Sequence, residues 1–590
     1  MSTPPASSLA ASLTTSVTAV LERPSMPATG GSLLCEALKA HGVTVMFGYP
    51  GGAALPLYRE LANHPQLEHL LVRHEENAAL AADGYARATG RPGVCLATSG
   101  PGATNLLTGI ANAMMDSVPV LALTGQVASS AIGTQAFQEV DIISMARPVT
   151  KATFQARTPD EVPGLVAEAF RVMMEGRPGP VLLDLPKDVM LGLSGGDSPE
   201  PAAGTESPRR LVVEPEESDV RRVLELLANA ERPVLAAGRG VLLANATDHL
   251  LTLAERSDTP VVTTLLGLGS VDESHELAFG MAGMHGTVAA NMALHHADLV
   301  IGVGMRFDDR WVGRAADFAP GATIVHVDVD REAFGRVVRC DVPVLADAGS
   351  FLAALAERAP RARRQGWLES LRAWEREHVD CLRSSEGDAL GSADAVRMLR
   401  EETGGAVTLV ADVGQHQMYA ALHWGFERPD SFFTSGGLGT MGYSLPAAMG
   451  IKMARPAEEV WTVVGDGCFQ MSTPELTTLA ANRIDVKMLL LNNSCLGMVR
   501  QWQELFYDGV YSHSILPQPD FARLAESHGV AGRTAASHDE LREAIRWARE
   551  TPGPVLIDVR VPMEETVLPM VPAGAANGEI LCAEGRVLVE

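Results

Sequence analysis

The sequence has few cysteines, a deficit of basic residues and no long apolar run. Its seven cysteines are scattered singly along 590 residues. That argues against a disulfide framework or a zinc site and predicts free thiols in a reducing cytoplasm. No apolar stretch approaches about 20 residues, so no membrane span is expected. The 47 Lys and Arg are outnumbered by 72 Asp and Glu, which argues against a nucleic-acid partner.

The composition is that of compact α/β domains, with 46% hydrophobic and 20% charged residues. The first 28 residues are the exception, because they are rich in Ser, Thr, Ala and Pro. They lack the basic start and continuous apolar core of a secretory peptide. A transit peptide usually has more arginine than the single Arg23 found here. The sequence therefore predicts a disordered tail.

Strand-like apolar runs alternate with helical stretches over most of the chain, which predicts α/β domains with doubly wound parallel sheets. The strand candidates are 43–48, 93–98, 118–124, 180–186, 233–238, 260–264, 299–304, 324–330, 407–411, and the runs that end at 465 and 493. We expect three such domains, at 29–194, 212–358 and 388–565. The remaining segments are a tail (1–28), a linker (195–211), a connector (359–387) and a C-terminal tail or lid (566–590). The first and third domains are expected to share one architecture.

Two strand ends in the third domain carry oxygen ligands. Val463 to Gly467 is an apolar run that stops at Gly465-Asp466-Gly467, and Met488 to Asn493 ends in two amides. In a βαβ unit such strand ends are neighbours at the carboxyl edge of the sheet. A carboxylate and an amide oxygen suit Mg²⁺ held jointly with phosphates. The spacing resembles the Gly-Asp-Gly…Asn-Asn motif of thiamine-diphosphate enzymes.

Two further loops are expected near that edge. Gly437 to Gly442 contains G-x-G-x-x-G, but no acidic residue ends a following strand at the distance that a dinucleotide fold requires. These glycines more plausibly let the backbone approach a ring system, with Met441 as an apolar wedge. The segment 412–416 follows another strand. Gln415 and His416 are predicted to donate hydrogen bonds to phosphate oxygens.

A carboxylate also opens a predicted helix in the first domain, within Arg73-His74-Glu75-Glu76. At a helix N-terminus it could serve only the helix dipole. Thiamine chemistry, however, needs a carboxyl group hydrogen-bonded to the aminopyrimidine N1′. That role requires a buried group with a raised pKa. Glu75 is the preferred candidate and Glu76 is the alternative.

Taken together, the motifs resemble the large catalytic subunits of the acetolactate synthase (acetohydroxyacid synthase) family over residues 30 to 575. The motifs that carry this resemblance are 48–52 (Gly-Tyr-Pro-Gly-Gly), 73–75, 98–105, 136–139, 283–287, 306–310 (Arg-Phe-Asp-Asp-Arg) and 497–502 (Gly-Met-Val-Arg-Gln-Trp). The runs 306–310 and 498–502 are the most specific to biosynthetic synthases.

The resemblance implies a role for each matching position. The first domain would bind the thiamine pyrimidine, with Glu75 activating the cofactor, and the third would bind the diphosphate. Mg²⁺ would be held by Asp466, Asn493 and the backbone carbonyl of Cys495. The other implied cofactor contacts in the third domain are Val413, Gly414, Gln415, His416, Gly439, Met441, Gly465 and Gly467. Because the family's thiamine lies between two subunits, a homodimer or homotetramer is implied.

The resemblance also implies that the central domain binds FAD in a structural role. The implied contacts are Arg177, Met284, His285, Gly286, Thr287, Gly304, Arg306, Asp308, Asp328 and Asp347. From the residues alone we infer only an α/β block that suits a nucleotide. A turn-capping role for Asp328 is nearly as plausible as a ribose contact.

The implied reaction belongs to valine, leucine and isoleucine biosynthesis. Pyruvate is decarboxylated and its two-carbon unit is joined to a second pyruvate, giving 2-acetolactate, or to 2-oxobutyrate, giving 2-aceto-2-hydroxybutyrate. Arg310 would hold the acceptor carboxylate, and Trp502 would favour the larger acceptor. Gly52, Gln138 and Lys151 match other substrate-contact positions. A small regulatory subunit would have to be a separate chain.

Four alternatives remain open on the sequence alone. Two are sister thiamine enzymes: a catabolic FAD-free acetolactate synthase, which the 306–310 run disfavours, and a pyruvate oxidase that uses FAD as an oxidant. A catalytically silent thiamine-binding homologue is disfavoured because Glu75, Asp466, Asn493 and Trp502 are all intact. An NAD dehydrogenase rests only on the glycine motif.

Overall fold

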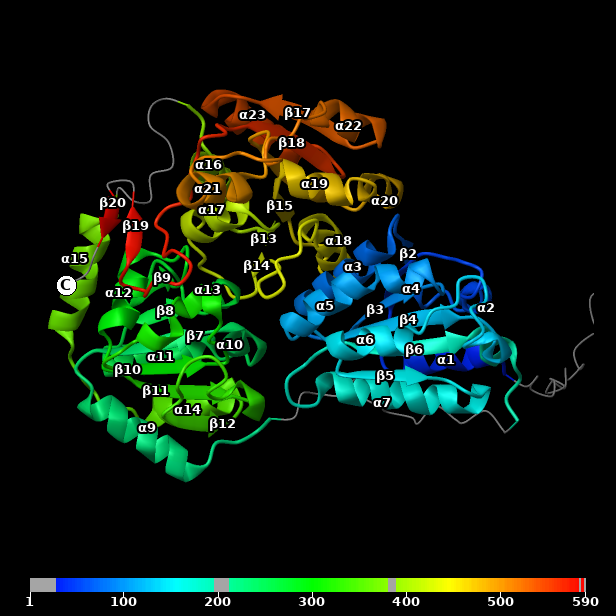
Figure 1. The fold of residues 1–590 in the computed structure, drawn as a ribbon, viewed down its shortest axis with the longest axis horizontal. Helices are drawn as coiled ribbons and strands as arrows, with labels where there is room; N and C mark the ends of the chain where they lie inside the picture. The colour runs from blue at the N-terminus through cyan, green and yellow to red at the C-terminus, as the bar shows by residue number, and fades with distance from the viewer. Residues whose placement is uncertain (1–27, 196–211, 380–388, 583–584, 588–590) are drawn as a thin grey trace, which may run out of the picture.

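The computed structural model describes residues 28–195, 212–379 and 389–582, and the backbone of 585–587. Almost all of the predicted tail and linker, and parts of the connector and of the C-terminal segment, lie outside these residues. The described chain forms three six-stranded parallel sheets flanked by helices, together with a short antiparallel hairpin (Figure 1). The predicted α/β fold with three doubly wound domains is confirmed. No helix among the described residues is long and apolar enough to cross a membrane.

The first domain has strand order β2-β1-β3-β4-β6-β5. Its helices and strands are α1 Gly30–Ala40, β1 Val45–Gly48, α2 Leu55–Leu61, β2 Glu68–Leu71, α3 Glu75–Thr89, β3 Gly93–Ala97, α4 Pro101–Asn105, α5 Leu107–Met115, β4 Val120–Gln126, α6 Ile142–Ala146, β5 Ala152–Gln155, α7 Val162–Met174, β6 Val181–Pro186 and α8 Lys187–Leu191. Helices α3 and α5 cover one face of the sheet, and α1 and α7 cover the other.

The central domain has strand order β12-β11-β10-β7-β8-β9. Its elements are α9 Glu217–Asn229, β7 Pro233–Ala237, α10 Arg239–Leu243, α11 Thr247–Ser257, β8 Val261–Thr263, β9 Ala278–Met281, α12 Val288–His296, β10 Leu299–Val303, α13 Asp309–Val312, β11 Thr323–Asp328, β12 Val342–Leu345, α14 Ala348–Arg358 and α15 Gln365–Glu377. Counted from β7, this is the order 3-2-1-4-5-6 of dinucleotide-binding folds. The expected connector contains α15, whose Trp367 donates to the carbonyl of Pro233.

The third domain has strand order β14-β13-β15-β16-β18-β17 and repeats the order of the first. Its elements are α16 Ser392–Thr403, β13 Thr408–Ala411, α17 Gln415–His423, β14 Phe432–Phe433, α18 Ser444–Ala454, β15 Val460–Gly465, α19 Asp466–Ser472, α20 Glu475–Asn482, β16 Val486–Asn492, α21 Gly497–Phe506, α22 Phe521–Ser527, β17 Ala531–Ala535, α23 His538–Glu550 and β18 Val555–Arg560. The hairpin of β19 Ile580–Cys582 and β20 Gly585–Val587 follows.

The first and third domains share one hydrophobic core. A continuous cluster runs from the α3 face of the first sheet, through α3 and α18, to one face of the third sheet. The two helices approach so closely that a Cβ on Gly84 would lie 2.2 Å from the carbonyl oxygen of Ala447. Conversely, a Cβ on Gly450 would lie 1.9 Å from the carbonyl oxygen of Ala81. Glycine is therefore required on both helices.

The C-terminal segment joins the third domain to the central one. The amide of Val567 donates to Gln501, and the amide of Val571 donates to the carbonyl of Met284. Farther along, Asn577 donates to Asn291 and to the carbonyl of Trp311. Residues 566–582 therefore lie across both domains.

The predicted strands are all present, but the sequence patterns did not single out seven others in the three sheets, nor the two strands of the C-terminal hairpin. Six of these are the edge strands of the three sheets: β2, β5, β9, β12, β14 and β17. The side chains of β2, β5 and β17 are partly exposed, so these strands lack the continuous apolar run on which the predictions relied. The seventh is β18, a buried internal strand.

The prediction that all cysteines are free thiols is wrong for Cys582, which is disulfide-bonded. Five cysteines of the described chain are free: Cys35, Cys95, Cys340, Cys468 and Cys495. Single cysteines far apart in a sequence do not reveal a pairing that tertiary structure creates.

The close approach of α3 and α18 predicts a large difference between two helical glycines. Gly84→Ala should destabilise the protein by about 1–3 kcal/mol, because its Cβ meets backbone that cannot move away. Gly164→Ala, in α7, should be neutral or stabilising by about 0.5–1 kcal/mol, since a Cβ on Gly164 would have nothing within 4 Å of it. Denaturant unfolding of both variants measures this, and equal effects would contradict the packing described.

Candidate active site

The carboxyl ends of β13, β15 and β16 bring most of the predicted thiamine-site residues together. β13 and β15 are adjacent in the sheet, although β14 comes between them in sequence. That is a topological switch point, where α/β folds bind ligands. The loop after β13 supplies Val413, Gly414 and the start of α17. The ends of β15 and β16 supply Asp466 and Asn493.

The predicted metal ligands lie in two adjacent loops of this edge. Asp466 is 2% exposed. Its carboxylate accepts hydrogen bonds from the amide of Gly467 at 2.8 Å and from Gln518 at 2.8 Å. Burial raises the pKa of Asp466 to about 6. Asn493 lies at the end of the neighbouring strand, where its side-chain oxygen accepts from the amide of Cys495 at 3.2 Å. A carboxylate and amide and carbonyl oxygens are the donors that Mg²⁺ prefers.

The side chain of Gln415 is not free to bind a phosphate, contrary to the sequence-based prediction. Its amide nitrogen donates to Gln501 and to the carbonyl of Glu565, both at 2.9 Å. Its oxygen accepts from Asn493 at 3.3 Å. With both N–H groups used, Gln415 can reach a ligand only through its backbone at the N-terminus of α17. Its side chain instead holds Asn493 in place.

His416 has a buried ring nitrogen without a hydrogen-bond partner in the described chain, as a site that binds a ligand should. The residue is 8% exposed, and its Nε2 has no partner among the described residues. Burial lowers the pKa of His416 to about 4, so the ring is neutral at pH 7. A Cβ on Gly465 would lie 2.6 Å from Nδ1, which explains a glycine before Asp466. A buried nitrogen without a partner is costly, so a ligand atom is expected here.

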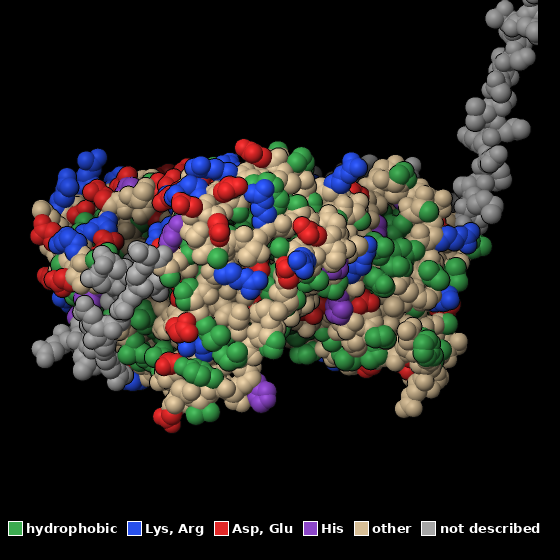
Figure 2. Space-filling model, turned by 90° about the horizontal axis from the view of Figure 1, so that it is seen from above, with side chains coloured by type: hydrophobic (Ala, Val, Ile, Leu, Met, Phe, Trp, Pro, Cys, Tyr) green, Lys and Arg blue, Asp and Glu red, His purple; other side chains and the backbone are tan. Residues whose placement is uncertain are grey.

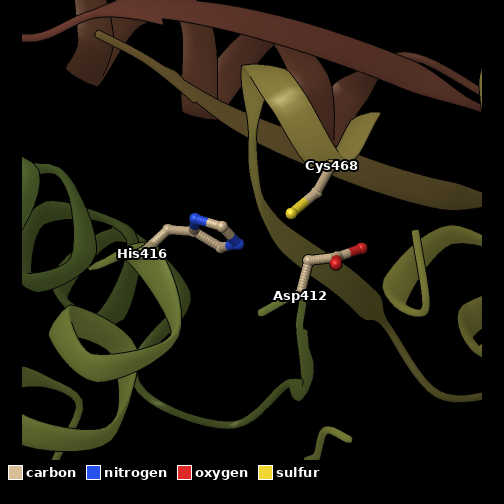
Figure 3. A group of neighbouring side chains, drawn as sticks. All are labelled: Asp412, His416 and Cys468. Atoms are coloured by element: carbon tan, nitrogen blue, oxygen red, sulfur yellow. The ribbon is translucent and has the colours of Figure 1, made fainter. Parts of the chain in front are cut away.

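Asp412, His416 and Cys468 form the one cluster in the described chain whose side-chain types and spacing could suit a metal, and their side chains converge in Figure 3. The contacts argue against that role. The carboxylate of Asp412 accepts from the amides of Val413, Gly442 and Ser444 at 2.8–2.9 Å. Burial raises the pKa of the Cys468 thiol well above its usual value, and the thiol donates to the carbonyl of Val413. Asp412 and Cys468 instead have a structural role, because they hold the backbone of neighbouring loops by hydrogen bonds.

The glycine loop, residues 435–442, lies beside this edge and is anchored by another domain. Asp116, from the first domain, accepts the amides of Gly436 and Gly437 at 3.0 and 2.7 Å. Gly439 has a left-handed φ of 72°. The Cε of Met441 would lie 3.8 Å from a Cβ on Gly467. The predicted wedge therefore lies against the loop that holds Asp466.

Three predicted first-domain residues, Gly52, Glu75 and Gln138, lie at the carboxyl edge of the first sheet. Glu75 is the first residue of α3, and its carboxylate accepts from Asn105 at 3.0 Å. Gln138 has a φ of 60° and packs against Gly100. Burial raises the pKa of the alternative residue, Glu76. All of these contacts come from the first domain.

Lys151 is not brought to that edge. It precedes β5 and its amide donates to the carbonyl of Pro180, which precedes β6. It therefore lies at the amino edge of the same sheet. Its ammonium donates to the carbonyl of Glu175 at 2.5 Å, and burial lowers the pKa of Lys151 to about 8.

A cavity of about 1290 Å³ lies where the three domains meet. Its wall includes Arg239, Gly240, Gly304 and Met305, from the segments that follow β7 and β10 at the switch point of the central sheet. Predicted residues on its wall are Arg177, Met284, His285, Gly304, Arg306, Asp308, Asp328, Arg310, Trp502, Val413, Gly414 and Gly439. Burial raises the pKa of Asp328 to about 6. The Nδ1 atom of His285 has no partner among the described residues.

Three predicted residues of the central domain have structural roles instead. The hydroxyl of Thr287 caps α12 by accepting from the amide of Ala290. Asp347 caps α14. A Cβ on Gly286 would lie 2.5 Å from the carbonyl oxygen of Met281. None of the three lines the cavity.

Comparison with known proteins identifies the family. Models of thiamine pyrophosphate enzymes match all three domains: the N-terminal TPP binding domain at 28–145, the central domain at 220–355 and the C-terminal TPP binding domain at 412–559. The chain is 44% identical to the acetolactate synthase large subunit of Corynebacterium glutamicum, covering 94% of this chain and 90% of that protein. It is 42% identical to the acetolactate synthase isozyme 2 large subunit of Escherichia coli, covering 94% and 99%.

The chain belongs to the acetolactate synthase large-subunit family. The resemblance inferred from the sequence motifs is confirmed. It is a thiamine-diphosphate enzyme, and the residues at the carboxyl edge of its third sheet fit that cofactor because they leave the Nε2 of His416 unsatisfied in the first turn of α17, near the loop of Asp466.

Two functional features of this synthase escaped the sequence analysis. Gly238-Arg239-Gly240 follows β7, where dinucleotide folds place their glycine turn, and Arg239 and Gly240 line the cavity. A Cβ on Gly240 would lie 2.5 Å from the Cα of Gly304. The pair of glycines that follows the apolar run of β7 is the sequence signal from which this turn could have been predicted. Met115, Asp116 and Ser117 also line the cavity, and no motif indicated them.

The unsatisfied nitrogen of His416 predicts a specific loss of cofactor affinity. His416→Ala should weaken thiamine diphosphate binding about tenfold to a hundredfold, since a hydrogen bond to a charged group contributes about 1.5–3 kcal/mol. His423→Ala, on the same helix but at its far end, should bind normally. Isothermal titration calorimetry of each apoprotein with thiamine diphosphate measures both affinities. Equal affinities in the two variants would show that His416 makes no such contact.

Proposed function

We propose that this synthase decarboxylates pyruvate and ligates the resulting two-carbon unit to a second 2-oxo acid. The observation that carries the proposal is the pairing of Arg310 with Trp502 on the cavity wall that also includes Val413, Gly414 and Gly439. The guanidinium lies 5.6 Å from the centre of the Trp502 ring. Bound thiamine diphosphate supplies the electron sink for the decarboxylation.

Arg310 and Trp502 have complementary tasks in this proposal. Arg310 is exposed. Its guanidinium donates to the Sδ of Met284 at 3.4 Å and makes a loose contact of 3.9 Å with Asp309. These weak contacts leave it able to bind a carboxylate bidentately. Trp502 presents a flat apolar surface beside it. That surface suits the ethyl group of 2-oxobutyrate as well as the methyl group of pyruvate. Gly52 and Gln138, but not Lys151 at the amino edge of the first sheet, would contact the same substrates.

Mg²⁺ is proposed to bind Asp466, Asn493 and the carbonyl of Cys495. These residues supply the hard oxygen donors that Mg²⁺ requires. Val413, the backbone of Gln415, Gly465 and Gly467 would complete the diphosphate site.

FAD is proposed to occupy the central part of the cavity in a structural role. The support is the dinucleotide strand order of this sheet and the glycine contacts at its switch point. Arg177, Arg306 and Asp328 would contact it. His285 would pair its unsatisfied nitrogen there.

Glu75 is proposed to activate the cofactor of a second subunit in a homodimer or homotetramer. Its carboxylate lies among first-domain residues, and Glu75 does not line the cavity. Apolar side chains suited to a subunit contact are exposed in the first and third domains: Phe137 is 88% exposed and Tyr507 is 62% exposed. On one face of the molecule, hydrophobic side chains gather toward the lower part of Figure 2. A separate small regulatory subunit is proposed because close relatives are named large subunits.

Product analysis tests the proposal. The purified protein with pyruvate, thiamine diphosphate, Mg²⁺ and FAD should form acetolactate without oxygen uptake, and Glu75→Gln should lower kcat by about 10²-fold or more. Oxygen consumption with acetate or acetyl phosphate would make the chain an oxidase and FAD an oxidant.

Adding 2-oxobutyrate should yield 2-aceto-2-hydroxybutyrate, and Trp502→Leu should lower that product relative to acetolactate. Absence of turnover would indicate a silent homologue.

A further inference from the structure

A buried carboxylate of the third domain contacts the turn that carries Glu75. Glu475 is the first residue of α20 and has 0% of its surface exposed. Its Oε1 accepts the backbone N–H of Arg73 at 2.7 Å and the side-chain amide of Asn77 at 2.9 Å. Its Oε2 accepts the hydroxyl of Thr478 at 2.6 Å. The chain positions of the two first-domain donors lie two residues to either side of Glu75.

A helix-dipole role does not account for this arrangement. A carboxylate at a helix N-terminus gains its small stabilisation at the protein surface. Glu475 is fully buried, and among the described residues no Lys, Arg or His forms an ion pair with it. Its three hydrogen-bond donors are all neutral, and two of them belong to another domain. A buried charge held in this way is costly to desolvate, so stability alone is a poor reason for it.

The geometry fixes both flanks of Glu75. Arg73 lies in the turn between β2 and α3, and Asn77 lies in the first turn of α3. One oxygen atom holds the backbone before Glu75 and the side chain after it. The carboxylate of Glu75 itself accepts from Asn105. Misplacement of a catalytic group by about 1 Å can cost about 10²-fold in rate.

We propose that Glu475 is a positioning residue for Glu75. This rests on the proposed function, in which Glu75 activates thiamine diphosphate. Glu475 begins the helix after α19, which starts at Asp466. Each chain therefore links its own metal-binding segment to the Glu75 that serves the other subunit.

Two substitutions at position 475 separate positioning from charge. Glu475→Ala leaves the Arg73 amide and the Asn77 side chain without their acceptor, and should free the turn. In Glu475→Gln, Oε1 retains both donors and the new amide faces Thr478, whose hydroxyl can accept. We expect Glu475→Ala to lower kcat about tenfold to a hundredfold, with KM for pyruvate and thiamine diphosphate affinity within about twofold of wild type. Glu475→Gln should retain most of the activity.

Hydrogen–deuterium exchange of the apoprotein provides a readout that does not depend on catalysis. Backbone amides of residues 72–77 should exchange faster in Glu475→Ala and at the wild-type rate in Glu475→Gln. Glu273→Ala is the matched control, because Glu273 also accepts a backbone N–H across a domain boundary, from Phe426 at 2.6 Å. The control should leave both kcat and the exchange of 72–77 unchanged.

Several results would overturn the proposal. These are wild-type exchange and kcat in Glu475→Ala, an equal loss of kcat in Glu475→Ala and Glu475→Gln, or the same loss in the Glu273 control. Failure of the proposed function itself would give results different from these. In that case Glu75→Gln would itself retain activity, or the wild-type protein would not form acetolactate. Should Glu475→Ala not fold, Asn77→Ala, which removes one of the two donors, gives the same test.

Discussion

The close packing of α3 against α18 is the contact on which the rest of the arrangement depends. Gly84 and Gly450 allow the two backbones to approach within van der Waals contact. This contact joins the cores of the first and third domains. Near the C-terminal end of α3, Arg87 forms ion pairs with Asp83 at 2.6 Å and Asp116 at 2.8 Å, and all three side chains are buried. The N-terminal end of the same helix carries Glu75.

Through these contacts α3 is connected both to the glycine loop of the third domain and to the turn that carries Glu75. Asp116 and Asn112 hold the glycine loop that bears Met441, by accepting the amides of Gly436 and Gly437 and the hydroxyls of Ser435 and Thr440. Glu475 holds the turn before α3. Removing one partner from a buried charged network is far more costly than its net contribution to stability. The network therefore specifies geometry more than it stabilises the fold.

Sequence reasoning found the parts of the molecule where chemistry and burial leave a strong local pattern. Apolar runs predicted the central strands. Short polar motifs singled out Asp466 and Asn493 at the ends of two of them, and Glu75 at the start of a helix. The edge strands β2, β5 and β17 escaped because their partly exposed residues lack that pattern. The commitment of the Gln415 side chain to Gln501 and Glu565, the amino-edge position of Lys151 and the disulfide at Cys582 all depend on contacts between distant segments. The switch-point glycines after β7 were visible in the sequence but became meaningful only with the strand order known.

The central claim is that Glu75 of one chain acts on the cofactor held by Asp466 and Asn493 of another. It is tested most directly by complementation between two inactive variants, Glu75→Gln and Asp466→Asn. After the two are mixed and their subunits exchanged, a mixed dimer would contain one site with neither substitution. The account predicts recovery of up to about a quarter of wild-type activity, because about half of the dimers would be mixed and each would have one working site. A mixture that stays inactive, although mixed dimers are detected by mass spectrometry, would contradict it.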